Sequence, residues 1–154
     1  MNQRQQIFII LFSFFVAVFS YSISAKADIS IVQKLRFGEV VITNNNNQHS
    51  ITVNTDGSFS HSGSIININD PQPGIYQIED LVPNSIIHIT ATQSQPLSAG
   101  GNFFTLKNFQ IVHSNSDASG LANITLGATA QTSGNSASYD SQTYNGKIQI
   151  QINY

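Results

Sequence analysis

The residues of this chain that could do acid–base or metal chemistry are scattered along it. The four histidines are His49, His61, His88 and His113, and no H-x-x-x-H or H-E-x-x-H spacing joins any two of them. A zinc site would therefore need ligands brought together from distant segments. The eight carboxylates are equally dispersed, and no spacing singles out a pair that could act as a glycosidase acid and base.

Nucleophiles and phosphate-binding loops are also missing from the pattern. The chain has no cysteine, no G-x-S-x-G elbow, no G-x-x-x-x-G-K-[ST] loop and no G-x-G-x-x-G fingerprint. We therefore expect a protein that is not an enzyme, with no catalytic residue, no cofactor and no metal. A secreted hydrolase is the third-ranked alternative, and it would require titratable groups converging in one pocket.

The N-terminal residues 1–27 form a targeting pattern. A charged start containing Arg4 is followed by an apolar run from Ile7 to Phe19, and small residues then lead to Ala25-Lys26-Ala27. This order predicts a signal peptide that is cleaved after Ala27. The apolar run is shorter than the roughly 20 residues of a membrane span. We expect export to the periplasm, the cell surface or the medium.

The remaining residues, 28–154, are expected to form a single domain. They contain four basic and eight acidic residues, which gives a net charge of −4. The basic residues are not clustered, so we expect neither a nucleic-acid partner nor attachment to an anionic membrane surface. We also expect no stable membrane span in the mature chain.

Hydrophobic alternation dominates residues 28–154 and predicts strands throughout. Asp56-Gly57 lies between two alternating runs, which predicts a hairpin with a type I′ turn. We expect Gln95–Asn102 to be a loop, Phe103–Val112 to be one strand or a bent pair, and Gly127 to mark a bulge. No segment keeps the periodicity of a helix. The predicted fold class is all-β: an immunoglobulin-like antiparallel β-sandwich of about seven to nine strands.

Two apolar segments are candidates for pairing with another chain. At the C-terminus the apolar face consists of Ile148, Ile150, Ile152 and Tyr154, flanked by uncharged amides and guarded only by Lys147. Natural sheet edges are usually protected by charge or proline. The N-terminal segment Asp28–Phe37 is its natural complement, with Ile29, Ile31, Leu35 and Phe37 on one parity. The open alternatives are that the C-terminal strand is internal and that Asp28–Phe37 is the protein's own first strand rather than a donated one.

Several short motifs, taken in order, resemble one known family. These are Leu35-Arg36-Phe37-Gly38-Glu39-Val40, Asp56-Gly57 with Ser62-Gly63, Ile75-Tyr76-Gln77-Ile78 with Pro83-Asn84, Leu106-Lys107-Asn108-Phe109, and Tyr144-Asn145-Gly146 before the terminal strand. They are similar to motifs of DUF4402, a bacterial exported family of unknown function. The resemblance implies an exported immunoglobulin-like β-sandwich, fimbria-like in some members, with no catalytic residues to carry over. One departure is that a glycine common after the central strand is replaced near Glu79-Asp80-Leu81.

Together these observations predict an exported structural or surface-assembly protein, such as a fimbria-like subunit. Its partners would be itself or other surface subunits, bound by strand pairing. The alternative is a monomeric secreted adhesin or glycan-binding module. In that case exposed aromatic side chains would contact the ligand, and the candidates are Tyr76, Tyr139 and Tyr144.

Overall fold

The computed structural model describes residues 27–69 and 71–153, and ten strands make up its regular structure. They are β1 (Asp28–Gln33), β2 (Val40–Ile42), β3 (Ser50–Val53), β4 (Phe59–His61), β5 (Ile65–Asn67), β6 (Gly74–Glu79), β7 (His88–Ala99), β8 (Asn102–His113), β9 (Ala122–Gln131) and β10 (Asn145–Asn153). Every pairing between them is antiparallel. The predicted all-β antiparallel class is confirmed, with one strand more than the upper end of the expected range. The predicted signal peptide, residues 1–27, lies outside the described residues except for Ala27, and Asp70 and Tyr154 lie outside them too.

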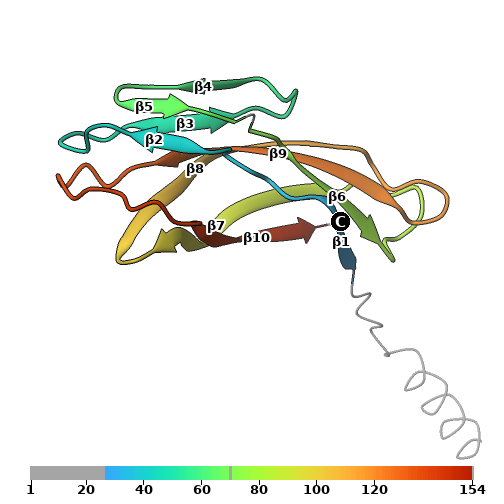
Figure 1. Cartoon of the computed structure of the whole chain (residues 1–154). Coiled ribbons are helices and arrows are strands. Elements are labelled where there is room, and N and C mark those ends of the chain that lie inside the picture. The colour runs from blue at the N-terminus through green and yellow to red at the C-terminus, as the bar shows by residue number, and fades with distance from the viewer. Residues whose placement is uncertain (1–26, 70, 154) are drawn as a thin grey trace, which may run out of the picture.

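Eight strands form one continuous network (Figure 1), with the order β1-β6-β9-β8-β7-β10. The long strand β9 pairs with β8 along one edge. Along its other edge, its first half pairs with β6 and its last residues pair with β3, which in turn pairs with β4. The short strands β2 and β5 form a separate two-stranded sheet. The path therefore begins at β1 and ends at β10.

A bend in β8 turns this network into two facing layers. Residues 102–104 of β8 pair with β7, whereas residues 105–113 pair with β9. The ladder with β9 is interrupted between Lys107 and Gln110, and Asn108 between them has φ of 50°. A bulge of this kind bends and twists a strand. Phe103–Val112 is thus a single bent strand, one of the two expected arrangements.

Two apolar clusters fill the space between the layers. The first cluster contains Ile78, Leu81, Ile87, Ala122 and Ile124, all buried. The second contains Ile51, Phe104, Leu106 and Ala130. Partly buried side chains from the outer strands complete both clusters, which are the main source of hydrophobic stabilisation in a chain without disulfides.

The hairpin predicted at Asp56-Gly57 joins β3 to β4, but its turn type differs from the prediction. Gly57 has φ of 85°, whereas Asp56 is not among the residues with positive φ, as a type I′ turn would require. The Gly57 N–H donates to Asn54 O (3.1 Å) and the Asn54 N–H donates to Ser58 O (2.8 Å). This pattern fits the three-residue hairpin loop that ends in a left-handed glycine.

Two other local expectations were wrong. Gln95–Asn102 is not a loop, because β7 continues to Ala99 and turns into β8 through Gly100-Gly101, both with positive φ. Gly127 is not a bulge. A Cβ at that position would lie 2.5 Å from the carbonyl oxygen of Val53, so the glycine allows β3 to approach β9 closely.

Asp80 lies near the position where the family resemblance leads us to expect a glycine, and it adopts the backbone conformation that a glycine would favour. Asp80, directly after β6, has φ of 59°. Aspartate tolerates this left-handed region better than most residues. The substitution therefore leaves a turn with left-handed geometry at the end of β6.

Candidate functional site

The C-terminal strand β10 lies at the edge of the sheet. Its only strand partner among the described residues is β7, and the register runs without interruption from Ile148 opposite Gln93 to Asn153 opposite His88. One long edge of backbone N–H and C=O groups is therefore left without a strand partner. This segment carries no proline, and the nearest charge is on Lys147, so it has few of the protections typical of natural edges.

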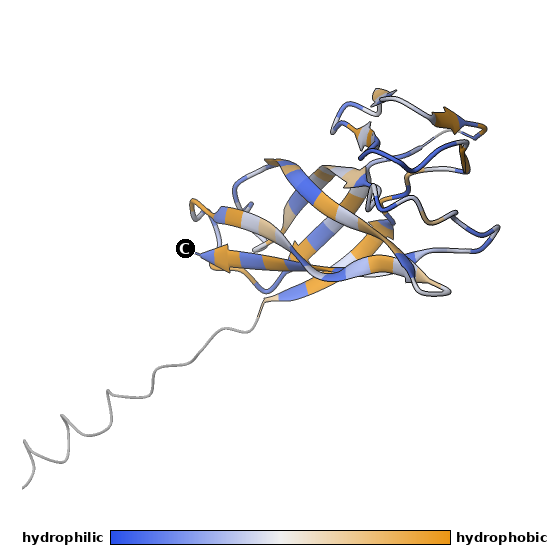
Figure 2. Cartoon of the chain, turned by 90° about the vertical axis from the view of Figure 1, so that its left-hand side faces the viewer, coloured by the Kyte–Doolittle hydropathy of each residue, from blue (hydrophilic) through white to orange (hydrophobic). Residues whose placement is uncertain are grey.

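The side chains of β10 divide between core and solvent as the alternation predicts. Figure 2 shows alternating hydrophobic and hydrophilic bands along the strand that ends at the C-terminus. Ile150 and Ile152 pack against the first cluster and Ile148 packs against the second, whereas Gln149 and Gln151 are exposed. The outer face of β10 thus consists of amide side chains, and the isoleucines of its inner face pack against the core.

The N-terminal strand β1 is the other end of the strand path, and it is less regular. Among the described strands it pairs only with β6, and its register shifts between Ile31 and Gln33, which leaves Val32 as an extra residue. Ile31 is 59% exposed and Val32 is 64% exposed. Asp28–Phe37 therefore does not present one apolar face.

The remaining residues predicted for the N-terminal half of the interface have different surroundings. Ile29 packs against the first cluster, together with Ile150 and Ile152. Phe37 packs against the second cluster, and Leu35 is half-buried outside any strand. In this structure the segment forms the first strand of its own chain.

The edges of β1 and β10 lie near each other without being paired. They are the two ends of the strand path, and both contribute side chains to the first cluster. The end of β10 lies beside β1 in Figure 1, and Figure 2 shows the same neighbourhood from another side. We call this unpaired boundary the seam. Successive antiparallel pairings around the path give β1 and β10 opposite directions.

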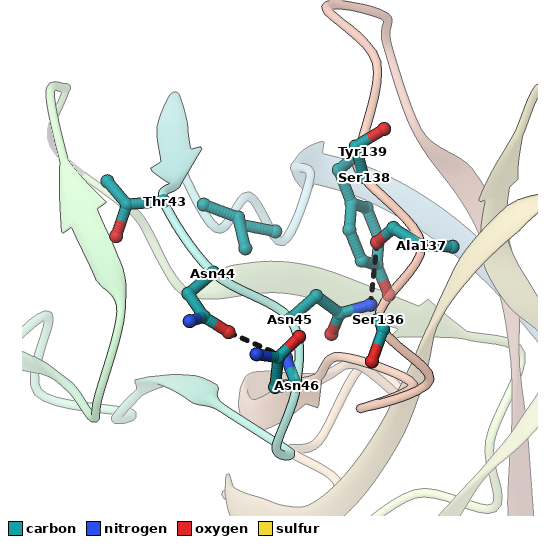
Figure 3. A pocket seen from close by; sticks show the side chains of 9 residues that line it. Thr43, Asn44, Asn45, Asn46, Ser136, Ala137, Ser138 and Tyr139 are labelled. Atoms are coloured by element: carbon teal, nitrogen blue, oxygen red, sulfur yellow. Dashed lines mark hydrogen bonds between the residues drawn. The ribbon is translucent and has the colours of Figure 1, made fainter.

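A second feature lies in the loops, away from the seam. A hollow of about 250 Å³ is lined by residues 42–46, which run from the end of β2 into the following loop, and by residues 136–139, which lie between β9 and β10 (Figure 3). None of its nine lining residues is charged. Among the tyrosines predicted to meet a ligand, only Tyr139 lines this hollow.

The three tyrosines have different surroundings. Tyr139 packs at a tilt and Tyr144 packs edge-to-face against Phe104, with ring centroids 4.7 Å and 5.2 Å from the Phe104 ring. Burial raises the pKa of the Tyr144 hydroxyl above its ordinary value. Tyr76 lies on β6 against the first cluster, and desolvation likewise raises its pKa. Tyr144 and Tyr76 therefore serve the core more than any surface.

A comparison with protein-family models identifies the family of this chain. The family model described as a domain of unknown function (DUF4402) matches residues 28–154. The chain belongs to the DUF4402 family. No curated protein and no solved structure matches it. Because the DUF4402 description names no activity, the function has to be argued from the edge of β10 and the loop hollow.

Within residues 27–69 and 71–153, no group of three or more His, Cys, Asp or Glu side chains could hold a metal ion. The described part also contains no helix long and apolar enough to cross a membrane.

Sequence reasoning missed the hollow because its two walls are about 90 residues apart along the chain. By composition, Asn44–Gln48 is a polar loop and Ser133–Ser141 is a small polar segment, and neither is distinguished from an ordinary loop. The only signal was that both are polar, uncharged and free of the alternation found elsewhere. That composition does not indicate which loops meet.

Proposed function

We propose that this protein is an exported, non-enzymatic structural subunit that assembles at the cell surface by pairing of sheet edges, as a fimbria-like subunit does. The observation that carries the proposal is the free edge of β10. It is long, regular and nearly uncharged, and it is anchored to the core by Ile150 and Ile152. An added strand would gain main-chain hydrogen bonds along this edge, and the alternating side chains would set its register.

The charge distribution is consistent with assembly of like chains. Over residues 148–153 no side chain is charged, so two copies could approach this edge without direct repulsion. The predicted signal peptide supports export, and the family supplies no competing activity. The alternative function, a monomeric adhesin or glycan-binding module, depends on the loop hollow instead of on β10.

The test is the mass in solution of residues 28–154 across a wide range of protein concentration, measured by sedimentation velocity. We expect oligomers whose size increases with concentration. Gln151→Lys places a charge on the exposed face of the free edge and should weaken self-association by about tenfold or more, because lysine is a natural guard of sheet edges.

The matched control is Asn123→Lys. Asn123 is also an exposed amide, but it lies on β9, which has strand partners on both sides. This variant adds the same charge and should assemble like the parent chain. A parent chain that stays monomeric at every concentration, or two variants that assemble equally well, would remove the basis of the proposal.

A further inference from the structure

The loop hollow takes no part in the proposed assembly, and its construction indicates a role of its own. One wall comes from the end of β2 and the residues after it, and the other comes from the loop between β9 and β10; Ile42 and Tyr139, one from each wall, both pack against the second cluster. Figure 3 shows the side chains of Asn44, Asn46, Ser136 and Tyr139 gathered around one space.

The two walls are held together by one buried amide. The Asn45 side chain is 5% exposed, and its Nδ2 lies within hydrogen-bond distance of Ser133 Oγ (3.1 Å), Asn135 Oδ1 (3.1 Å) and Ala137 O (2.8 Å). Its Oδ1 accepts the N–H of Gly134 (3.0 Å). Both the amide nitrogen and the amide oxygen of Asn45 are thus engaged inside the protein, and the role of this side chain is to fix the hollow in shape.

The backbone adds to this fixation. The Ser136 N–H donates to the carbonyl oxygen of Asn45 (2.9 Å), and Ser136 has φ of 68°. A serine in the left-handed region carries a conformational cost, and it persists only where its surroundings impose it. The hollow is therefore formed before any ligand arrives, which lowers the entropic cost of binding.

The lining offers hydrogen-bonding groups that the protein itself does not use. The side chains of Asn46, Ser136 and Ser138 make no hydrogen bond with any described residue. Asn44 uses its Oδ1 to accept the Asn46 N–H (2.7 Å), and its Nδ2 stays free of partners within the described chain. The hollow thus presents amide and hydroxyl groups that can both donate and accept.

The aromatic wall supplies an apolar surface. The Tyr139 hydroxyl donates to Phe103 O (2.6 Å) and accepts the Ser133 N–H (3.0 Å), so its polar end is occupied. Tyr139 therefore presents its aromatic ring to the hollow, and tilted contacts with the rings of Phe104 and Tyr144 hold it in place. A fixed ring beside free amides suits a ligand with one apolar face and many hydroxyl groups.

We propose that this hollow binds a neutral saccharide, recognised through one sugar ring. The absence of charge in the lining gives no counter-ion for a phosphate, a carboxylate or an ammonium group. The volume of about 250 Å³ falls below the roughly 300–1,000 Å³ of sites for drug-sized ligands, which favours a single ring at the end or side of a glycan.

The test uses the processed chain labelled with ¹⁵N and carrying Gln151→Lys, so that assembly does not interfere. Glucose, galactose, mannose and N-acetylglucosamine are titrated separately into the protein, and amide chemical shifts are followed by NMR. We expect saturable shifts for at least one sugar, confined to residues 42–46 and 136–139. Inorganic phosphate and glucuronate, as charged probes, should produce no saturable shift in these residues.

A matched pair of variants separates binding from loop stability. Asn46→Ala removes a free amide from the lining and should weaken binding by about fivefold, whereas Asn47→Ala removes an exposed neighbouring amide that is not part of the lining and should change nothing. No saturable shift with any of the four sugars, equal binding by Asn46→Ala, or preferred binding of the charged probes would overturn the proposal. Each result is independent of whether the chain assembles through β10.

Discussion

The strands β1 and β10 both lie at an end of the strand path, but they differ in length and in regularity. Each is an end of the path and has one strand partner among the described residues, and Ile29 of β1 packs against the first cluster as do Ile150 and Ile152 of β10. Yet β1 has six residues and a bulge at Val32, whereas β10 has nine residues and an uninterrupted register from Ile148 onward. The ladder of β10 shifts register on either side of Lys147, but residues 148–153 then form a longer regular run than any in β1.

The comparison shows that apolar alternation alone does not make an edge suitable for pairing. By side-chain pattern, Asp28–Phe37 is the natural complement of the C-terminal strand. The inserted Val32 twists the β1 edge, and a bulge is one of the ways in which natural proteins prevent pairing at an edge. The capacity to pair therefore depends on backbone regularity, with side chains as a second requirement.

The largest expected effect comes from removing β1. A chain that starts at Gly38 loses the contact of Ile29 with the first cluster and of Phe37 with the second. It also exposes the edge of β6. Because a domain of this size is stable by only about 5–15 kcal/mol, we expect the truncated chain to lose its cooperative thermal unfolding transition, measured by circular dichroism. The control is residues 28–154.

The opposite result would reverse the roles of the two edges. A truncated chain that melts cooperatively, and that takes up a synthetic Asp28–Phe37 peptide, would make this segment a detachable donor strand. The assembling contact would then be the groove on β6, and Gln151→Lys should leave assembly intact.

An intermediate effect is expected from shortening one isoleucine on each edge strand. Ile150→Ala removes part of a half-buried side chain that packs on the first cluster, and it should lower the free energy of unfolding by about 1–2 kcal/mol. Ile31→Ala acts on a side chain that is mostly exposed and should change stability by less than about 0.5 kcal/mol. Urea unfolding measures both values. Equal losses would mean that β1 and β10 contribute alike to the core.

The sequence was sufficient for those features that depend on local patterns. Alternation at Ile148, Ile150 and Ile152 correctly indicated a strand with one face toward the core, and Asp56-Gly57 correctly marked a hairpin. Period-two patterns and turn residues act over a few positions, so one sequence reveals them. The family motifs, taken in order, led to the family that the model match confirms.

The features that the sequence did not reveal depend on contacts between distant segments. The bulge at Val32 is defined by the register against β6, and the role of Gly127 is defined by the carbonyl oxygen of Val53. The hollow depends on Asn45 reaching Ser133 and Ala137 across the fold. A single sequence carries no direct record of such pairings, because the residues that approach one another are each ordinary in their local context.

The smallest expected effect concerns a third sheet edge, the three-residue strand β4, which pairs only with β3. In the turn before it, Asp56 Oδ1 accepts hydrogen bonds from the Ser58 hydroxyl (2.6 Å) and the Ser58 N–H (2.9 Å), and these bonds lower the pKa of the Asp56 carboxyl. Because the folded-state pKa lies below the unfolded one, any stabilisation is present above the unfolded pKa and is lost as the pH falls through the folded value.

Ser58→Ala should raise the pKa of Asp56 toward its ordinary value, as followed by NMR titration of the side-chain carboxyl. The change should leave self-association untouched, because β4 is too short to offer a continuous edge. Thr55→Ala, in the same turn but without a hydrogen bond to Asp56, is the control and should leave that pKa in place. If Ser58→Ala weakened assembly as strongly as Gln151→Lys, β4 would share the role assigned to β10, and backbone regularity would not be what distinguishes the edges.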